Sequence, residues 1–247
     1  MKDTLHMIPF TNLLLAFIPV SAVVGVLYLW SLKSRTALYA ITRMLAQLML
    51  IGYILTFIFE SNRAPIVIVV LSVMLLAASW ISLRPVQSKR KAVYPKALAS
   101  ITIGGLTTLI LITQGVLDLE TWYQPDFVIP LAGMIFANSM NTVSLAAERL
   151  EAETQRGILY VDARQVAFTA SLIPLINSLF AVGLVSFPGM MTGQILSGVS
   201  PLVAARYQIM VMCMIFGSAG ISSACYLILL KPKVEVIAAE WKGSGPA

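Results

Sequence analysis

Charged side chains are scarce in this sequence: Asp, Glu, Lys and Arg make up only 11% of its 247 residues. A soluble domain carries about 25% charged residues. Hydrophobic residues account for 58% of the chain, and its mean hydropathy is +0.87. This composition excludes a soluble globular protein and predicts an all-α integral membrane protein. Because no linker or low-complexity tract interrupts the chain, we expect one transmembrane domain over residues 1–247.

Catalytic motifs are also missing. No G-x-x-x-x-G-K-[ST] phosphate loop occurs, so we do not expect this chain to hydrolyse nucleotides by itself. The one histidine, His6, lies at the N-terminus, and no H-E-x-x-H motif is present, which argues against a zinc protease. Serine- and aspartyl-protease patterns are absent too. The sequence therefore predicts no enzyme and no cofactor in this chain.

Side chains that could bind a metal ion or carry a proton are few inside the apolar segments. Carboxylates fall at segment edges and in connections, whereas a proton-driven carrier usually keeps one near the bilayer midplane. The two cysteines, Cys213 and Cys225, are 12 positions apart in one segment, so they cannot pair within a helix and are expected to be buried packing thiols. The identity of any metal site stays unknown.

Charge-free stretches indicate seven membrane spans, since a helix needs about 20 apolar residues to cross a bilayer. The expected spans are 8–30, 40–59, 65–83, 97–117, 127–147, 166–187 and 207–230. Basic residues gather in alternate connections: Lys33, Arg35, Arg43, Arg84, Lys89, Arg90, Lys91, Lys96, Arg149, Arg156, Arg164, Lys231 and Lys233. The positive-inside rule then places the N-terminus outside and the C-terminus in the cytoplasm. Topology and the anionic inner leaflet explain the net charge of +6, so no nucleic-acid partner is expected.

The longest charge-free stretch, 165–205, contains the break Phe187-Pro188-Gly189. Proline removes a backbone donor and glycine loosens the chain, so one helix cannot continue through it. We expect a re-entrant or surface element on the outer side, with Pro188 and Gly189 as hinges. An eight-span alternative would place Lys231 outside. Pathway candidates in this element are Met190, Met191, Thr192 and Gln194; packing is the alternative role, and contact with a soft metal the less favoured one.

Polar side chains also occur within the spans. Asn138 and Asn141 lie three residues apart and share a helix face, so they serve either in hydrogen bonds between helices or as pathway lining. Pro174 predicts a kink, which is a gate hinge or a structural kink satisfied by a nearby side chain. Asn177 and Ser178 follow it as further pathway candidates. The small residues of 217–224 favour close packing, within the chain or between subunits.

The connection 148–164 carries mixed charge and is helix-prone as far as Thr154. It predicts a short amphipathic cytoplasmic helix that a soluble partner could push, with a solvated loop as the alternative. The residues expected to couple to that partner are Glu148, Glu151, Glu153, Gly157 and Arg164.

Several motifs resemble the FetB-type ABC transporter permeases, a family of bacterial iron-export permeases with plant relatives linked to aluminium tolerance. The likeness covers most of the chain. It is strongest in 133–140, 172–178, 182–201 and 206–210, the third of which contains the Pro-Gly-Met-Met-Thr-Gly block. Members carry a longer cytoplasmic segment before the sixth span, which the region 151–157 replaces here.

The resemblance implies an inner-membrane permease that works with a separate soluble ATPase subunit, which would hold the ATP and Mg²⁺. It also implies a homodimer of permeases and export of a metal ion, iron for the bacterial members. Alternatives are an ABC permease for a nucleotide sugar, a standalone channel or facilitator, and a membrane scaffold without transport activity.

Overall fold

A computed structural model describes residues 9–61, 63–86 and 90–243, without the side chains of 10, 56–57, 59–61 and 232–243. Every regular element in those ranges is a helix, apart from one isolated bridge between Val182 and Ser186. The all-α membrane fold is therefore confirmed. His6 and Lys89 lie outside the described residues. The chain divides into two compact units, 1–61 and 62–247, and each is described separately.

The first unit is a pair of apolar helical segments. The first segment comprises α1 (Phe10–Leu15) and α2 (Phe17–Leu29), which meet at Ala16. A tight connection with Ser31 in the left-handed region (φ 55°) leads into α3 (Ser34–Ser61). This helix begins six residues before the expected span of 40–59, because basic side chains near a membrane edge can remain in helix while their charges reach water.

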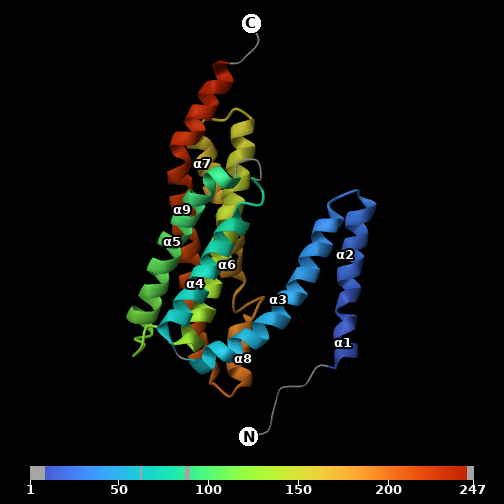
Figure 1. Cartoon of the computed structure of the whole chain (residues 1–247), viewed down its shortest axis with the longest axis vertical. Helices are drawn as coiled ribbons and strands as arrows, with labels where there is room; N and C mark the ends of the chain where they lie inside the picture. The colour runs from blue at the N-terminus through green and yellow to red at the C-terminus, as the bar shows by residue number, and fades with distance from the viewer. Residues whose placement is uncertain (1–8, 62, 87–89, 244–247) are drawn as a thin grey trace. The chain divides into compact units, whose positions relative to one another are not determined.

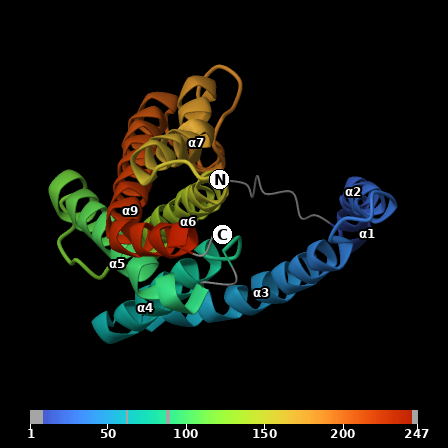
Figure 2. The same cartoon turned by 90° about the horizontal axis from the view of Figure 1, so that it is seen from above.

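The second unit is a helical bundle (Figure 1). Its elements are α4 (Ala64–Ser82), α5 (Arg90–Ile110), η2 (Leu111–Val116), α6 (Pro125–Gln155), α7 (Tyr160–Ala181), α8 (Gly189–Leu196) and α9 (Pro201–Gly243). The central helix is α6, which contacts α4, α5, α7 and α9, as the view in Figure 2 shows. Its apolar face supplies Ile135, Phe136 and Val143 to one continuous buried cluster.

Helices α5 and α9 approach each other closely at Gly104 of α5. A Cβ atom built on Gly104 would lie 2.3 Å from Ser222 Oγ and 2.8 Å from the carbonyl oxygen of Ser218. A Cβ atom built on the next residue, Gly105, would lie 2.8 Å from the Phe136 ring of α6. Small residues allow backbones to approach closely in a membrane bundle, where there is no hydrophobic force between helices. The pair of glycines therefore sets the spacing of three helices.

The small residues of 217–224 divide between two environments. Ser218, Ala219, Ser222 and Ser223 are fully buried, and Ser223 lies 3.0 Å from the hydroxyl of Ser171 in α7. Packing within the chain thus explains these four positions. A Cβ on Gly217 or Gly220 would meet nothing within 4 Å.

The expectation of buried thiols is wrong for Cys213 of the same helix, which is exposed in this chain.

Six described helices are long and apolar enough to cross a membrane, within 11–29, 34–55, 64–82, 90–116, 125–155 and 201–231. The segment α7 is not among these six, so the count of seven spans stays a prediction. The last helices continue past the ends of the charge-free stretches, because charged residues that reach water do not end a helix.

The expected span 166–187 is wrong at its end, since α7 stops at Ala181. Val182 (φ −64°, ψ 129°) and Gly183 (φ 82°) form a type II turn, in which Leu184 N donates to Ala181 O at 3.2 Å. That turn requires a positive φ at its third position, which glycine adopts without strain.

Candidate functional site

The Pro-Gly break lies where the sequence places it, and a separate short helix follows it. Pro188 precedes α8 in extended conformation (φ −62°, ψ 143°), and its carbonyl oxygen accepts from Thr192 N at 3.0 Å and Thr192 Oγ1 at 3.2 Å. Gly189 begins the helix, which packs against α9. Met190 and Thr192 are exposed, whereas Met191 is half-buried.

Gln194 is the most enclosed polar residue of α8. Its Oε1 atom is buried and has no hydrogen-bond partner within the described ranges. Oε1 of Gln208, in α9, is in the same situation. Buried amide oxygens normally find a partner, because desolvation without one is costly. Both α8 and α9 therefore carry a buried amide oxygen with unused hydrogen-bonding capacity.

The two asparagines of α6 do not join helices within the unit. Asn138 Nδ2 donates to Met134 O of its own helix at 2.8 Å, and Asn141 is exposed. The neighbouring residue Ser139 is fully buried instead. Asn141 is thus left uncovered by the packed core and Asn138 is half covered, and among the described residues neither forms a hydrogen bond to another helix.

The polar residues of α7 show the same arrangement. Pro174 lies inside the helix and is exposed, as are Asn177 and Ser178. If Pro174 makes a structural kink, either Ser171 or Asn177 was expected to satisfy the carbonyl that it frees near Ala170. The hydroxyl of Ser171 instead donates to Phe168 O at 2.8 Å and contacts Ser223.

Asn141, Asn177 and Ser178 are exposed and Asn138 is half-buried, on two helices that contact each other. We call Asn138, Asn141, Asn177 and Ser178 the uncovered polar face. Among the residues that the structure describes, Asn141, Asn177 and Ser178 have no side-chain hydrogen bond. Exposure of amides to lipid would be unfavourable, since hydrocarbon offers them no partner. The arrangement therefore suits an aqueous pathway or a second protein surface.

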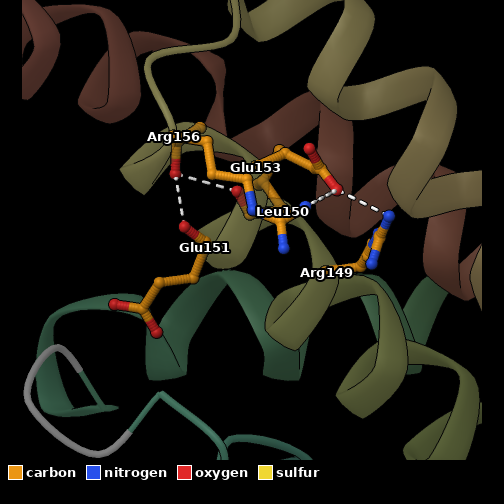
Figure 3. Close-up of polar contacts among 6 residues, drawn as sticks. Arg149, Leu150, Glu151, Glu153 and Arg156 are labelled. Carbon is orange, nitrogen blue, oxygen red and sulfur yellow. Dashed lines mark hydrogen bonds and ion pairs between the residues drawn. The ribbon is translucent and has the colours of Figure 1, made fainter.

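The connection 148–164 is organised around a buried carboxylate at the end of α6 (Figure 3). Glu153 is only 3% exposed, and its Oε1 lies 2.7 Å from Arg149 Nη2 and 3.5 Å from Arg156 Nη1. The separate amphipathic helix expected in this region is instead the last part of α6, which runs to Gln155 without interruption. Gly157 then turns the chain with φ 81°.

The other expected coupling residues occupy different positions. Glu148 is exposed and Glu151 is half-buried. Gly157 lies in the exposed turn, whereas Arg164 lies on α7 and lines a groove against α9. The surface open to a partner at this end therefore comprises Glu148, Glu151 and the turn 155–159, while Glu153 is enclosed.

Two long-range hydrogen bonds connect this end of the bundle to α9. Tyr160 Oη, at the start of α7, donates to the carbonyl oxygen of Leu227, and Lys96 Nζ of α5 donates to that of Leu229. Sequence reasoning missed both contacts. A phenol and an ammonium close to the basic end were the available signal, but their backbone acceptors could not be identified from spacing.

A cation-π contact closes the turn between α4 and α5. The guanidinium of Arg90 lies 3.8 Å from the centre of the Trp80 ring, and its Nε donates to Trp80 O at 3.1 Å. Tyr94 meets the same indole edge to face, with ring centroids 5.5 Å apart.

Among the described residues, no group of three or more His, Cys, Asp or Glu side chains could hold a metal ion.

Removal of the buried carboxylate should destabilise the connection. We expect Glu153→Ala to lower the free energy of unfolding by about 1–2 kcal/mol, because a hydrogen bond to a charged group contributes about 1.5–3 kcal/mol and both arginines are partly solvated. Thermal unfolding of the detergent-solubilised chain would measure this effect. Glu148→Ala, at an exposed position of the same helix, should change stability by less than about 0.5 kcal/mol. Equal effects of the two changes would contradict a structural role for Glu153.

Comparison with known proteins identifies the family. The sequence matches UPF0014, described as an uncharacterised protein family, over residues 10–234. It is 34% identical to "UPF0014 membrane protein slr1647" of Synechocystis, over 72% of this chain and 74% of the relative. It is 33% identical to "Probable iron export permease protein FetB" of Escherichia coli, over 80% and 81% of the two chains.

A plant relative is also similar. "Protein ALUMINUM SENSITIVE 3" of Arabidopsis thaliana is 29% identical over 79% of this chain and 76% of its own length. No solved structure matches the chain. Six apolar helices and a relative named as a permease indicate a multi-pass protein of the plasma membrane, as expected. By its match over most of its length, the chain belongs to the UPF0014 family of membrane proteins.

Proposed function

We propose that this chain is the membrane permease of an ABC exporter, in which a separate soluble subunit hydrolyses ATP. The observation that carries the proposal is the similarity, over four fifths of the chain, to a protein named as an iron export permease. The sequence has no phosphate loop of its own, so the energy for transport would come from a partner that binds ATP and Mg²⁺.

The uncovered polar face supports a transport pathway. Asn138 and Asn141 on α6 belong to this face together with Asn177 and Ser178 on α7, and α6 contacts α7. In the proposed homodimer, this face of each copy would line a shared aqueous route. Amide and hydroxyl oxygens suit hydrated metal cations, and the cargo we favour is iron.

The Pro-Gly element would form the outer gate. Met190, Met191, Thr192 and Gln194 would line the mouth, and Gln194 brings an amide oxygen without a partner in the described chain. Pro188 and Gly189 would act as its hinges, and Pro174 would let the outer half of α7 change direction. A gate of this kind opens by rigid-body movement about a few backbone positions.

The ATPase would dock at the end of α6. Glu148, Glu151 and the Gly157 turn form the surface that a partner could reach, and Glu153 with its two arginines would keep that surface rigid. Tyr160 would pass movement of the connection to α9 through its bond to Leu227 O. On this arrangement Arg164 takes part through α7 rather than through direct contact with the ATPase.

A reconstituted complex tests the proposal. The chain in nanodiscs should bind a soluble ABC ATPase from the same organism and change its ATP turnover, and Glu151→Lys should abolish that change while leaving membrane insertion intact. Glu120→Lys, at an exposed position outside the docking surface, is the matched control and should behave as wild type. A chain that conducts iron with no ATPase present would favour the alternative of a channel or facilitator.

Transport of a nucleotide sugar instead of iron would retain the ABC mechanism and change only the cargo. Competition between the two substrates in the same vesicles would separate these cases.

A further inference from the structure

A groove of about 380 Å³ runs between α7 and α9, outside the uncovered polar face. Arg164, Gln165 and Phe168 line one wall, and Ala224, Leu227 and Ile228 line the other. Its volume lies within the range of about 300–1,000 Å³ that small-ligand sites occupy. The groove is thus large enough to hold part of an amphipathic molecule.

The two polar residues of the lining, Arg164 and Gln165, lie at one end of the groove. The two helices are antiparallel, because Tyr160 pairs with Leu227 whereas Ser171 pairs with the earlier residue Ser223. Arg164 and Gln165 therefore lie toward the end of the groove near Leu227 and Ile228, and Phe168 lies deeper, toward Ala224. This order places a guanidinium and an amide at one end of the groove, next to apolar side chains that line the rest of it.

Arg164 is the only described cation in the lining. Its side chain is half-buried, and no described residue forms an ion pair or hydrogen bond with its guanidinium. By contrast, Arg149 and Arg156 at the same end are bound to Glu153. A guanidinium presents several N–H donors in one plane, which matches the oxygens of a phosphate.

The end of the groove that holds Arg164 lies at the basic end of the bundle. Lys96 donates to Leu229 O and Lys231 follows that residue in α9, while Arg149 and Arg156 lie at the end of α6 that leads into α7. The positive-inside rule assigns this end to the cytoplasm. Anionic lipids are concentrated in the cytoplasmic leaflet, and basic pockets between membrane helices on this side bind their headgroups.

We propose that this groove binds one anionic phospholipid of the cytoplasmic leaflet. Arg164 and Gln165 donate hydrogen bonds to the lipid phosphate, and one acyl chain lies along Phe168, Ala224 and Ile228. Because α7 follows the cytoplasmic connection directly, the lipid joins α7 to α9 at the position where movement of that connection would enter the bundle.

Native mass spectrometry of the full chain tests this assignment, after release from nanodiscs that contain equal amounts of phosphatidylglycerol and phosphatidylcholine. The wild-type chain should retain phosphatidylglycerol in about fivefold preference, which corresponds to about 1 kcal/mol for one basic residue near an anionic lipid. Arg164→Gln should abolish the preference and Arg164→Lys should retain it. Arg84→Gln removes the same charge from an exposed site on the α4–α5 connection and should leave the preference unchanged.

A second pair of variants tests the apolar part of the groove. Ala224→Phe should fill it and reduce retention of both lipids, whereas Ile221→Phe, at an exposed position of the same helix, should not. Equal retention of the two lipids by the wild-type chain, or an unchanged preference in Arg164→Gln, would overturn the proposal. So would efficient disulfide cross-linking of two Ala224→Cys copies in native membranes, because a second copy would then occupy the groove.

Discussion

Replacement of Gly104 by alanine is expected to destabilise the second unit, because the added methyl group would overlap α9. The new Cβ would lie 2.3 Å from Ser222 Oγ, 2.7 Å from Ser222 N and 2.8 Å from Ser218 O. Two of these three atoms belong to the backbone of α9, so a change of side-chain rotamer cannot relieve the overlap. The helices must separate, and we expect a loss of about 1–3 kcal/mol.

Thermal unfolding of the chain in detergent would measure this change, at roughly 2–4 °C in Tm for each kcal/mol in a protein of this size. The matched control is Gly220→Ala on α9, where a Cβ would meet nothing within 4 Å. Alanine favours helix over glycine by about 0.8–1.0 kcal/mol, so this variant should unfold at or above the wild-type temperature. The same Tm for both variants would contradict the close approach of α5 to α9 at Gly104.

Replacement of Gly157 by proline is expected to reduce transport at least tenfold while the chain still inserts in the membrane. Gly157 has φ 81°, whereas the proline ring fixes φ near −65°. The change also removes the N–H that donates to Thr154 O at 3.1 Å. The turn between α6 and α7 must then re-form, and the docking surface at its edge would be displaced.

Gly157→Asn is the informative comparison, because asparagine tolerates the left-handed region better than other side chains. It should retain most of the ATP-dependent flux in vesicles, with insertion checked by protease accessibility. Full activity of Gly157→Pro would show that the turn takes no part in coupling.

The sequence predicted the features that depend on local chemistry. A proline followed directly by glycine favours a helix break, so the break at Pro188 and Gly189 could be located, although the short helix α8 that follows it was not predicted. Apolar length predicted the membrane helices in the same way. The end of α7 was misplaced because Gly183 sits in an apolar run, where no charge or proline marks the type II turn.

Features that depend on distant contacts could not be predicted. Gly104 and Ser222 are far apart in the sequence, and only folding shows that one accommodates the other. The burial of Glu153 could not be predicted either, because Glu148 is also a glutamate near the end of α6 and yet is exposed. For the pathway residues, the pattern identified polar side chains, and the structure adds that Asn141 and Asn177 are not covered by their own chain.

ATP-dependent flux in proteoliposomes is the most direct test of a permease driven by a separate ATPase. The chain and its partner would be reconstituted with the ATPase facing the bath, and Fe²⁺ and ATP would be added to that side. The account predicts that iron accumulates inside, that accumulation stops with a hydrolysis-deficient partner, and that Asn141→Leu combined with Asn177→Leu lowers it at least tenfold. Equal iron entry with and without the ATPase would contradict the account.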